Sequence, residues 1–130
     1  MQSDASAGST GTVQAAAGVD IGAEDAWALY DGGSRDVVVA LVDTGIDYTH
    51  ADLEGRIWVN EDEIPGNGVD DDGNGYIDDV YGWNFYSGSN QVYTGSEDSH
   101  GTHGAGTITA SSDNQVGIAG IVPGDNVKIM

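Results

Sequence analysis

The stretch Asp98-Ser-His-Gly-Thr-His-Gly-Ala-Gly-Thr-Ile-Thr-Ala110 decides the fold. Its small residues predict a helix over about residues 100–110 that packs closely against a sheet, and the Asp98-Ser99 pair could cap its first turn. Gly104 and Gly106 inside this helix each cost about 1 kcal/mol relative to alanine, which indicates a tight backbone approach there. The predicted helix therefore places a histidine at its start, close to the sheet.

The aliphatic run Val37-Val-Val-Ala-Leu-Val42 has turn residues on each side and leads into Asp43-Thr44-Gly45. A continuous apolar run of this length is typical of a strand covered on both faces, as in a parallel sheet. In α/β folds, ligands and catalytic groups lie beyond the carboxyl ends of such strands. We therefore expect an α/β fold in which the Asp43 carboxylate meets the His100 imidazole.

Other elements are predicted from hydrophobic periodicity and turn residues: a short amphipathic helix over residues 21–30, short strands or extended segments over residues 57–59 and 80–85, an apolar extended segment over residues 117–123, and a strand beginning at residue 127. Asp31-Gly-Gly33 is expected to end the first helix. Residues 1–19 are rich in Gly, Ala, Ser and Thr, so we expect a flexible lead-in to a single domain over residues 20–130.

The composition is strongly acidic and free of cysteine. Its 22 Asp and Glu residues against 3 Lys and Arg give a net charge of −19, whereas nucleic acids and anionic membranes are bound through Lys and Arg. Neither is therefore an expected partner, and no apolar run approaches the roughly 20 residues of a membrane span. The lack of cysteine excludes a disulfide framework, a thiolate nucleophile and a cysteine-based zinc site.

Acidic residues are concentrated between Asp43 and Asp79, above all in a loop over about residues 60–80. Within this loop, Asp70-Asp-Asp-Gly-Asn-Gly-Tyr-Ile-Asp78 has the ligand spacing and the glycine of an EF-hand calcium loop. The predicted Ca²⁺ ligands are Asp70, Asp72, Asn74, the Tyr76 carbonyl and Asp78. Tyr81 replaces the usual final glutamate, so the missing oxygens would come from Asp79, Glu61 or Glu63. The alternative is a solvated acidic loop.

Three motifs, in this order along the chain, resemble those of the subtilisin-like serine peptidases, the subtilase family. Val42-Asp-Thr-Gly-Ile-Asp47 is similar to the segment around the family's catalytic aspartate, and His100-Gly-Thr-His-Gly-Ala-Gly106 to that around its catalytic histidine. Gly117-Ile-Ala-Gly-Ile-Val-Pro123 is similar to the segment after the histidine helix. With Ala23-Glu-Asp-Ala-Trp27, the similarity covers about residues 20–130. It implies a three-layer subtilisin-like fold, with helices on both faces of a mainly parallel sheet, truncated at the C-terminus.

The resemblance also implies a reaction, the hydrolysis of peptide bonds in a protein or peptide substrate through acyl transfer to a serine. His100 would be general base and then general acid, and Asp43 would fix its tautomer and stabilise its charged form. The family's nucleophilic serine and oxyanion-hole asparagine have no counterpart in this sequence, and triad members act as a unit. We therefore expect the chain alone to be inactive and to need the missing C-terminal part of the domain. The family further implies a secreted, extracellular protein.

A second calcium site follows from the resemblance alone. Its implied ligands are the Asp52 carboxylate, the Asn114 side chain and the carbonyls of Ser111, Val116 and Ile118. The family's N-terminal ligand has no identifiable counterpart in residues 1–19. Gly104 departs from the family as well, because a branched apolar residue usually stands there.

Two other functions remain open from the residues themselves. One is a noncatalytic calcium-binding module or remnant with no peptidase role. The other is a metallohydrolase that binds zinc through His100 and His103, although the sequence suggests no third ligand and His103 suits a structural role better. Because the strand over residues 37–42 needs neighbours, we also expect a marginal monomer or association through its edges.

Overall fold

The computed structural model describes part of the chain: residue 16, residues 18–29 and residues 33–130. It divides into two units, Met1–Asp31 and Gly32–Met130, which we describe separately. In the first, α1 spans Ala23–Leu29, with Glu24 and Asp25 in the turn where the helix dipole favours negative charge. The predicted lead-in and the predicted stop at Asp31-Gly-Gly33 lie largely outside the described residues.

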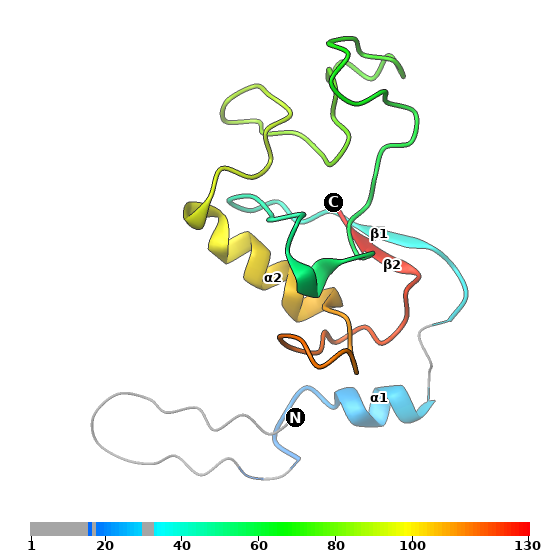
Figure 1. Ribbon diagram of the computed structural model, residues 1–130. Coiled ribbons are helices and arrows are strands. Elements are labelled where there is room, and N and C mark those ends of the chain that lie inside the picture. The colour runs from blue at the N-terminus through cyan, green and yellow to red at the C-terminus, as the bar shows by residue number, and fades with distance from the viewer. Residues whose placement is uncertain (1–15, 17, 30–32) are drawn as a thin grey trace. The chain divides into compact units, whose positions relative to one another are not determined.

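A small parallel sheet forms the centre of the second unit (Figure 1). β1 (Val37–Val39) pairs in parallel with β2 (Val127–Ile129). On the other edge of β2, Ile57 forms a parallel bridge to Ile129, and the N–H of Trp58 donates to the Ile129 carbonyl at 2.8 Å. The three apolar segments predicted as strands at residues 37–42, 57–59 and 127–130 therefore do lie side by side, with β2 in the middle.

Within residues 33–130, one face of this sheet is covered and the other is exposed. The covered face carries the apolar core, made of Ile46, Leu53, Ala105 and Ile129 with Val39, Leu41, Ile57 and Ile108 packed against it. Val38 and Val42 alternate with those side chains and are 47% and 96% exposed. In this part of the chain, α2 packs against one face of the sheet and forms two layers with it. Cover on the second face, and with it the three-layer arrangement, stays a prediction.

The helix α2 spans Ser99–Thr109, within one residue of the predicted limits. Its small residues face the sheet, and Ala105 and Thr109 are fully buried. The predicted cap is not formed. Asp98 ends a 3-10 turn, η2 (Ser96–Asp98), and its carboxylate turns back to the N–H and hydroxyl of Thr94. Its φ of −89° and ψ of 12° are not the extended angles that a capping residue adopts.

The tight backbone approach of α2 lies at Gly101 and not at Gly104 or Gly106. A Cβ atom on Gly101 would overlap the carbonyl oxygen of Gly45, in the turn after β1. At Gly104 the nearest atom would be a Leu41 methyl at 3.5 Å, and at Gly106 an Ile118 methyl at 3.6 Å, which are ordinary contacts. The predicted reason for the two helix glycines is therefore wrong, and the close contact joins the first turn of α2 to the turn after β1.

The segment over residues 117–123 runs back along the C-terminal end of α2. The backbone N–H groups of Ile121 and Val122 donate to the last-turn carbonyls of Thr107 and Ile108 at 3.0 and 2.9 Å, which have no partner in the helix itself. The N–H of Gly120 donates to the carbonyl of Ala110, the residue after the helix, at 2.9 Å. A Cβ atom on Gly120 would lie 2.8 Å from the Cα of Thr109, so this position admits no side chain. The predicted extended segment thus supplies hydrogen-bond donors to the carbonyls at the C-terminal end of α2.

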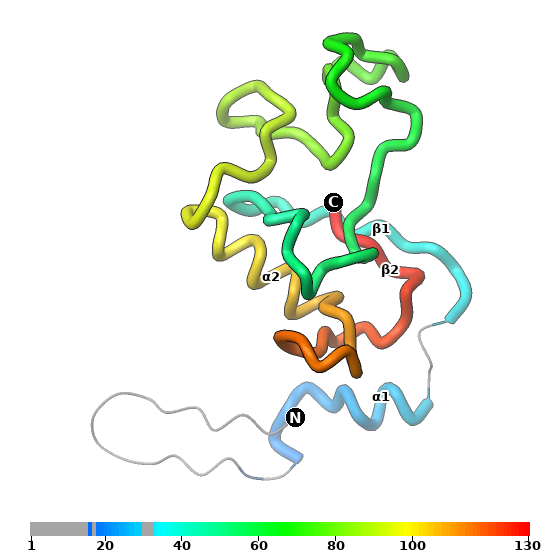
Figure 2. Tube along the Cα trace, in the orientation of Figure 1, coloured from blue at the N-terminus to red at the C-terminus, as the bar shows by residue number. Residues whose placement is uncertain are grey.

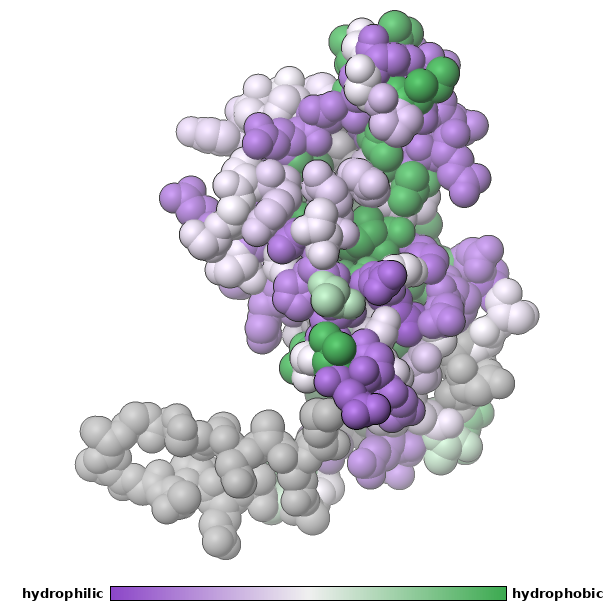
Figure 3. Space-filling model, viewed as in Figure 1, coloured by the Kyte–Doolittle hydropathy of each residue, from purple (hydrophilic) through white to green (hydrophobic). Residues whose placement is uncertain are grey.

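Residues 60–80 form a long loop, which Figure 2 traces in green. The N–H of Asn60 donates to the Val80 carbonyl at 2.8 Å and closes its base. The loop exposes Ile64, Val69 and Ile77, and apolar patches stand among hydrophilic residues at the top of Figure 3. In the described part of the chain, no helix has the length and apolar character needed to cross a membrane.

The prediction of an extended segment over residues 80–85 is wrong, since the chain turns there. The side chain of Asn84 accepts the N–H groups of Tyr86 and Ser87 at 3.1 and 3.0 Å, which folds the chain into a turn that a strand could not contain. Asn84 then meets Ser89 in an isolated antiparallel bridge. The local side-chain bonds therefore override the apolar alternation.

Candidate catalytic pair and cation sites

The Asp43 carboxylate and the His100 imidazole are in contact, although 57 residues separate them in the sequence. Asp43 follows the strand pairing at the carboxyl end of β1, and His100 lies in the first turn of α2. The Nδ1 atom of His100 is 2.8 Å from both Oδ1 and Oδ2 of Asp43. The Asp43 side chain is 19% exposed, whereas the His100 side chain is 82% exposed. The expected contact is thus present in the structure.

Hydrogen bonds favour the ionised form of Asp43. The backbone N–H of Thr44, which donates to Oδ1 at 2.7 Å, and then the His100 imidazole lower the pKa of Asp43 below its ordinary value. An ionised carboxylate holds the imidazole proton on Nδ1, so the neutral ring keeps a lone pair on Nε2. Such a ring can take a proton from a hydroxyl placed beside Nε2.

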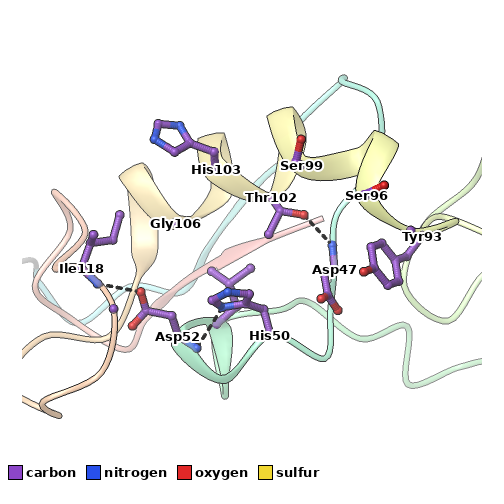
Figure 4. A pocket seen from close by; sticks show the side chains of 13 residues that line it. Asp47, His50, Asp52, Tyr93, Ser96, Ser99, Thr102, His103, Gly106 and Ile118 are labelled. Carbon is purple, nitrogen blue, oxygen red and sulfur yellow. Dashed lines mark hydrogen bonds between the residues drawn. The ribbon is translucent and has the colours of Figure 1, made fainter.

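His103 belongs to a different surface from His100. It lines a pocket of about 430 Å³ beside α2, together with Asp47, His50 and Asp52, and Figure 4 shows its ring directed away from His50. His100 is not part of this lining. Among the described residues, the one cluster whose ligand atoms converge is a group of three carboxylates, and neither histidine belongs to it. This arrangement does not favour a zinc site built on the two histidines.

The three converging carboxylates, Glu63, Asp72 and Asp79, lie inside the acidic loop, with ligand atoms within 4.8 Å of one another. Glu63 and Asp79 are buried. The side-chain amide of Asn60 donates to Asp72 and to Asp79 at 3.0 Å each, and that of Asn74 donates to the same two carboxylates at 3.0 and 3.1 Å. The Asn60 amide lowers the pKa of Asp72. Carboxylate oxygens are the ligands that Ca²⁺ prefers.

The oxygens of the other predicted side-chain ligands in the loop accept backbone N–H groups. The Asp70 carboxylate accepts the N–H of Asn74 at 3.1 Å, and the Asn74 side-chain oxygen accepts the N–H of Tyr76 at 2.8 Å. Asp78 is directed elsewhere, since its carboxylate accepts two backbone N–H groups at 3.0 Å, those of Asn67 and Gly68. The structure therefore brings Asp72 and Asp79 together with Glu63, the alternative oxygen donor, and does not bring Asp78 to them.

Asp52 is buried at 4% exposure beneath the loop over residues 111–118. Its Oδ2 accepts the N–H of Ile118 at 2.8 Å (Figure 4), and its carbonyl accepts that of Ser111 at 3.1 Å. Its buried Oδ1 has no hydrogen-bond partner, which is unusual for a carboxylate. Asn114 instead accepts the N–H of Val116 within the loop, at 3.0 Å. The structure thus joins Asp52 to both ends of the predicted ligand loop.

Two parts of these sites have no signal in the ligand spacing. Asn60 lies 12 and 19 positions from the two carboxylates that it bridges, and no motif relates residues at those distances. Gly101 and Thr102 lie inside the histidine motif itself, where the small size of one and the hydroxyl of the other could have drawn notice. Their contacts with the turn after β1 become visible only in the folded chain.

Comparison with known proteins gives matches over most of the chain. The model described as the subtilase family matches residues 34–130. Subtilisin-like protease 1 of Plasmodium berghei is 40% identical over 92 residues, which are 70% of this chain and 15% of that protein. The protein of the same name from Plasmodium vivax is 46% identical over 84 residues, 64% of this chain and 13% of that protein. The extracellular protease of Xanthomonas campestris is 37% identical over 94 residues, 69% and 16% respectively. The chain therefore spans less than a fifth of the length of these curated relatives.

Proposed function

Because the chain belongs to the subtilase family, we propose that residues 34–130 are the N-terminal portion of the catalytic domain of a serine endopeptidase. Asp43 and His100 would be two members of its catalytic triad. The observation that carries this proposal is the position of the His100 Nδ1, 2.8 Å from both carboxylate oxygens of Asp43. A histidine that merely capped the start of a helix would not need a carboxylate brought to it from a segment 57 residues away.

In this reaction His100 transfers the proton, and Asp43 orients the His100 ring. The carboxylate holds the proton on Nδ1, so Nε2 is free to take the proton of a serine hydroxyl as that hydroxyl attacks the peptide carbonyl. The imidazolium that forms is stabilised by the charge of Asp43, whose lowered pKa keeps it ionised at neutral pH. His100 then returns the proton to the leaving amine.

The nucleophilic serine is proposed to lie outside these 130 residues. Within residues 33–130 no serine hydroxyl is hydrogen-bonded to His100, and the Ser111 hydroxyl accepts the Nε–H of Arg56 at 3.2 Å instead. A base and its orienting carboxylate contribute little without the nucleophile. The 130-residue chain alone is therefore proposed to be inactive, and the rest of the catalytic domain to be its functional partner.

Calcium is the cofactor that fits the remaining sites. Glu63, Asp72 and Asp79 would hold one ion, because three carboxylates this close repel each other unless a cation joins them. Asp52 would hold a second with the loop over residues 111–118, and its buried Oδ1 without a partner supports this assignment. Bound calcium would supply positive charge that keeps both loops closed. None of the proton transfers above involves these ions.

The proposed substrates are proteins or peptides, and the proposed location is extracellular. The family membership supports the first, and the name of the Xanthomonas campestris relative, an extracellular protease, supports the second. Calcium is abundant outside cells, which agrees with a protein whose acidic loop needs a cation.

The experiment extends the chain through the rest of its catalytic domain and measures hydrolysis of a peptide library and labelling by a fluorophosphonate. We expect His100→Ala and Asp43→Asn each to lower kcat by about 10⁴-fold or more, because triad members act together. His103→Ala is the matched control and should retain activity, since His103 lines the pocket beside α2 and it is His100 that is hydrogen-bonded to Asp43. No hydrolysis and no labelling in an extended protein that still binds calcium would instead support a noncatalytic calcium-binding module.

A further inference from the structure

The turn after β1 and the first turn of α2 exchange hydroxyl hydrogen bonds. Thr102, in α2, accepts the backbone N–H of Asp47 at 2.9 Å, the bond drawn in Figure 4, and donates to the carbonyl of Asp98 at 2.9 Å. Thr44, in the turn, accepts the backbone N–H of Gly101 at 3.4 Å. Each segment thus supplies a threonine hydroxyl to the backbone of the other.

These two bonds flank the backbone contact between Gly45 and Gly101. A Cβ atom on Gly101 would overlap the Gly45 carbonyl and would lie 3.3 Å from the Cβ of Asp43. No side chain therefore separates the two segments at the point where they carry Asp43 and His100. Their spacing is set by backbone contact and by the two hydroxyl bonds.

The His100 ring has little packing of its own to fix it. Its side chain is 82% exposed, and the side chain hydrogen-bonded to it is Asp43. Whether Nδ1 reaches the carboxylate therefore depends on how the two backbones are held. A shift of about 1 Å at such a pair is enough to lower a reaction rate about 100-fold.

We propose that Thr102 is a positioning residue for the Asp43–His100 pair, with Thr44 as its reciprocal partner. The proposal rests on the proposed function for its catalytic meaning, whereas the geometry stands without it. Loss of the Thr102 hydroxyl would take the acceptor from the Asp47 N–H, only four residues after Asp43. The turn would then be free to move away from α2, and the carboxylate would move with it.

Thr107 distinguishes this role from ordinary packing within the helix. Its hydroxyl donates to the carbonyl of His103 at 2.9 Å, four residues earlier, as that of Thr102 does to Asp98. Thr107 is exposed, and no hydrogen bond of its hydroxyl to another segment is found within residues 33–130. Thr107→Val therefore removes the same bond within the helix and leaves the bonds between segments intact.

The test measures the tautomer of His100 in the nitrogen-15-labelled 130-residue chain. The chemical shifts of the ring nitrogens report which one carries the proton, at a pH where the ring is neutral, and Asp43→Ala gives the reference without the carboxylate. We expect Thr102→Val to lower the ratio of Nδ1–H to Nε2–H tautomers about 5-fold, as for one lost hydrogen bond. Thr102→Ser, which keeps the hydroxyl, and Thr107→Val should both retain the wild-type ratio.

An unchanged ratio in a folded Thr102→Val chain overturns the proposal, and so does an equal fall in Thr107→Val. If the amide spectrum shows that Thr102→Val is unfolded, Thr44→Val takes its place. It removes the longer of the two bonds, so it should lower the ratio by a smaller factor, and an unchanged ratio again overturns the proposal.

The tautomer measurement needs no serine and no hydrolysis, so failure of the proposed peptidase function would be seen separately in the extended protein. In that extended protein, Thr102→Val should lower kcat with KM little changed, whereas Thr107→Val should leave both unchanged. A fall in kcat without any change in the tautomer ratio would show that Thr102 acts in some other way and would count against its positioning role.

Discussion

The Asp43–His100 pair and the acidic loop over residues 60–80 hold their side chains by different means. The pair stands on a packed core, where α2 buries Ala105 and Thr109 against the sheet and Gly101 touches the backbone after β1. The loop exposes its apolar residues and is held by carboxylates that accept amide and backbone N–H groups. Packing does not depend on a ligand, whereas a cluster of like charges does. We therefore expect the pair to be formed without a cation and the loop to need one.

Glu63 shows how the loop is organised. It is 5% exposed, and its two carboxylate oxygens accept three backbone N–H groups at 2.8–3.2 Å: those of Asp71, Asp72 and Asp78. Hydrogen bonds of this kind partly offset the desolvation of a buried carboxylate but do not remove its repulsion from Asp72 and Asp79. The loop geometry is thus set by polar groups that a cation would strengthen.

The largest expected effect is at the packed contact of the pair. Gly101→Ala would force a methyl group into the Gly45 carbonyl, so we expect the free energy of unfolding to fall by about 3 kcal/mol and the Asp43–His100 contact to be lost. Gly104→Ala is the matched control in the same helix, where the new methyl would meet Leu41 at an ordinary 3.5 Å. It should raise the free energy of unfolding by about 0.5–1 kcal/mol. Urea denaturation measures both, and equal effects would contradict the backbone contact.

The second effect concerns the acidic loop. Calcium at about 100 times its dissociation constant should stabilise the chain by about 2.7 kcal/mol, because it binds the folded loop and not the unfolded chain. Asp72→Ala removes one of the three converging carboxylates and should abolish the part of this stabilisation that comes from the loop, whereas Asp52→Asn should leave that part intact. Thermal unfolding with calcium or with a chelator measures it.

The same calcium experiment tests whether the Asp43–His100 pair is independent of the acidic loop. The tautomer of His100 should be identical with calcium and with chelator, since the pair rests on packing. A change in tautomer on chelation would show that the two regions are coupled. An unchanged melting temperature on addition of calcium would contradict the proposed calcium sites.

The smallest expected effect is a change in the pKa of one carboxyl group in each region. The pKa of Asp43 is lowered first by the Thr44 N–H and then by His100, and that of Asp72 first by the Asn60 amide. His100→Ala should therefore raise the pKa of Asp43 part of the way to its ordinary value and leave that of Asp72 unchanged, and Asn60→Ala should do the reverse. Carboxyl-carbon NMR titration in chelator measures both. A shift of both groups in either variant would contradict the separation of the two regions.

The lowered values also set the sign of the acid response. A carboxylate with a depressed pKa stabilises the folded chain at pH values above its ordinary pKa of about 3.9, and this contribution is lost as the pH falls through the folded value. Asp43 and Asp72 should therefore contribute no loss of stability between neutral pH and about pH 5. The loss of folding stability below that range should be smaller in His100→Ala, which lacks a donor to Asp43, and in Asn60→Ala, which lacks a donor to Asp72.

The sequence predicts well where one short pattern carries the information. The limits of α2 and the parallel strands follow from small residues and aliphatic runs, and Asp43 and His100 were identifiable from their motifs. It predicts poorly where two segments compete for the same group. Asp98 has the chemistry of a helix cap, yet it bonds Thr94, and apolar alternation over residues 80–85 gives way to the turn that Asn84 closes.

The sequence by itself determined which chemical groups are present: an aspartate after an aliphatic strand, a histidine at the start of a small-residue helix, and a loop dense in carboxylates. Only the tertiary structure decided that Glu63 and not Asp78 joins Asp72 and Asp79, that the close approach falls on Gly101, and that Thr102 binds the backbone beside Asp43. The reason is physical. Periodicity and composition act over a few neighbouring residues, whereas these contacts join segments whose distance is set by packing across the whole fold.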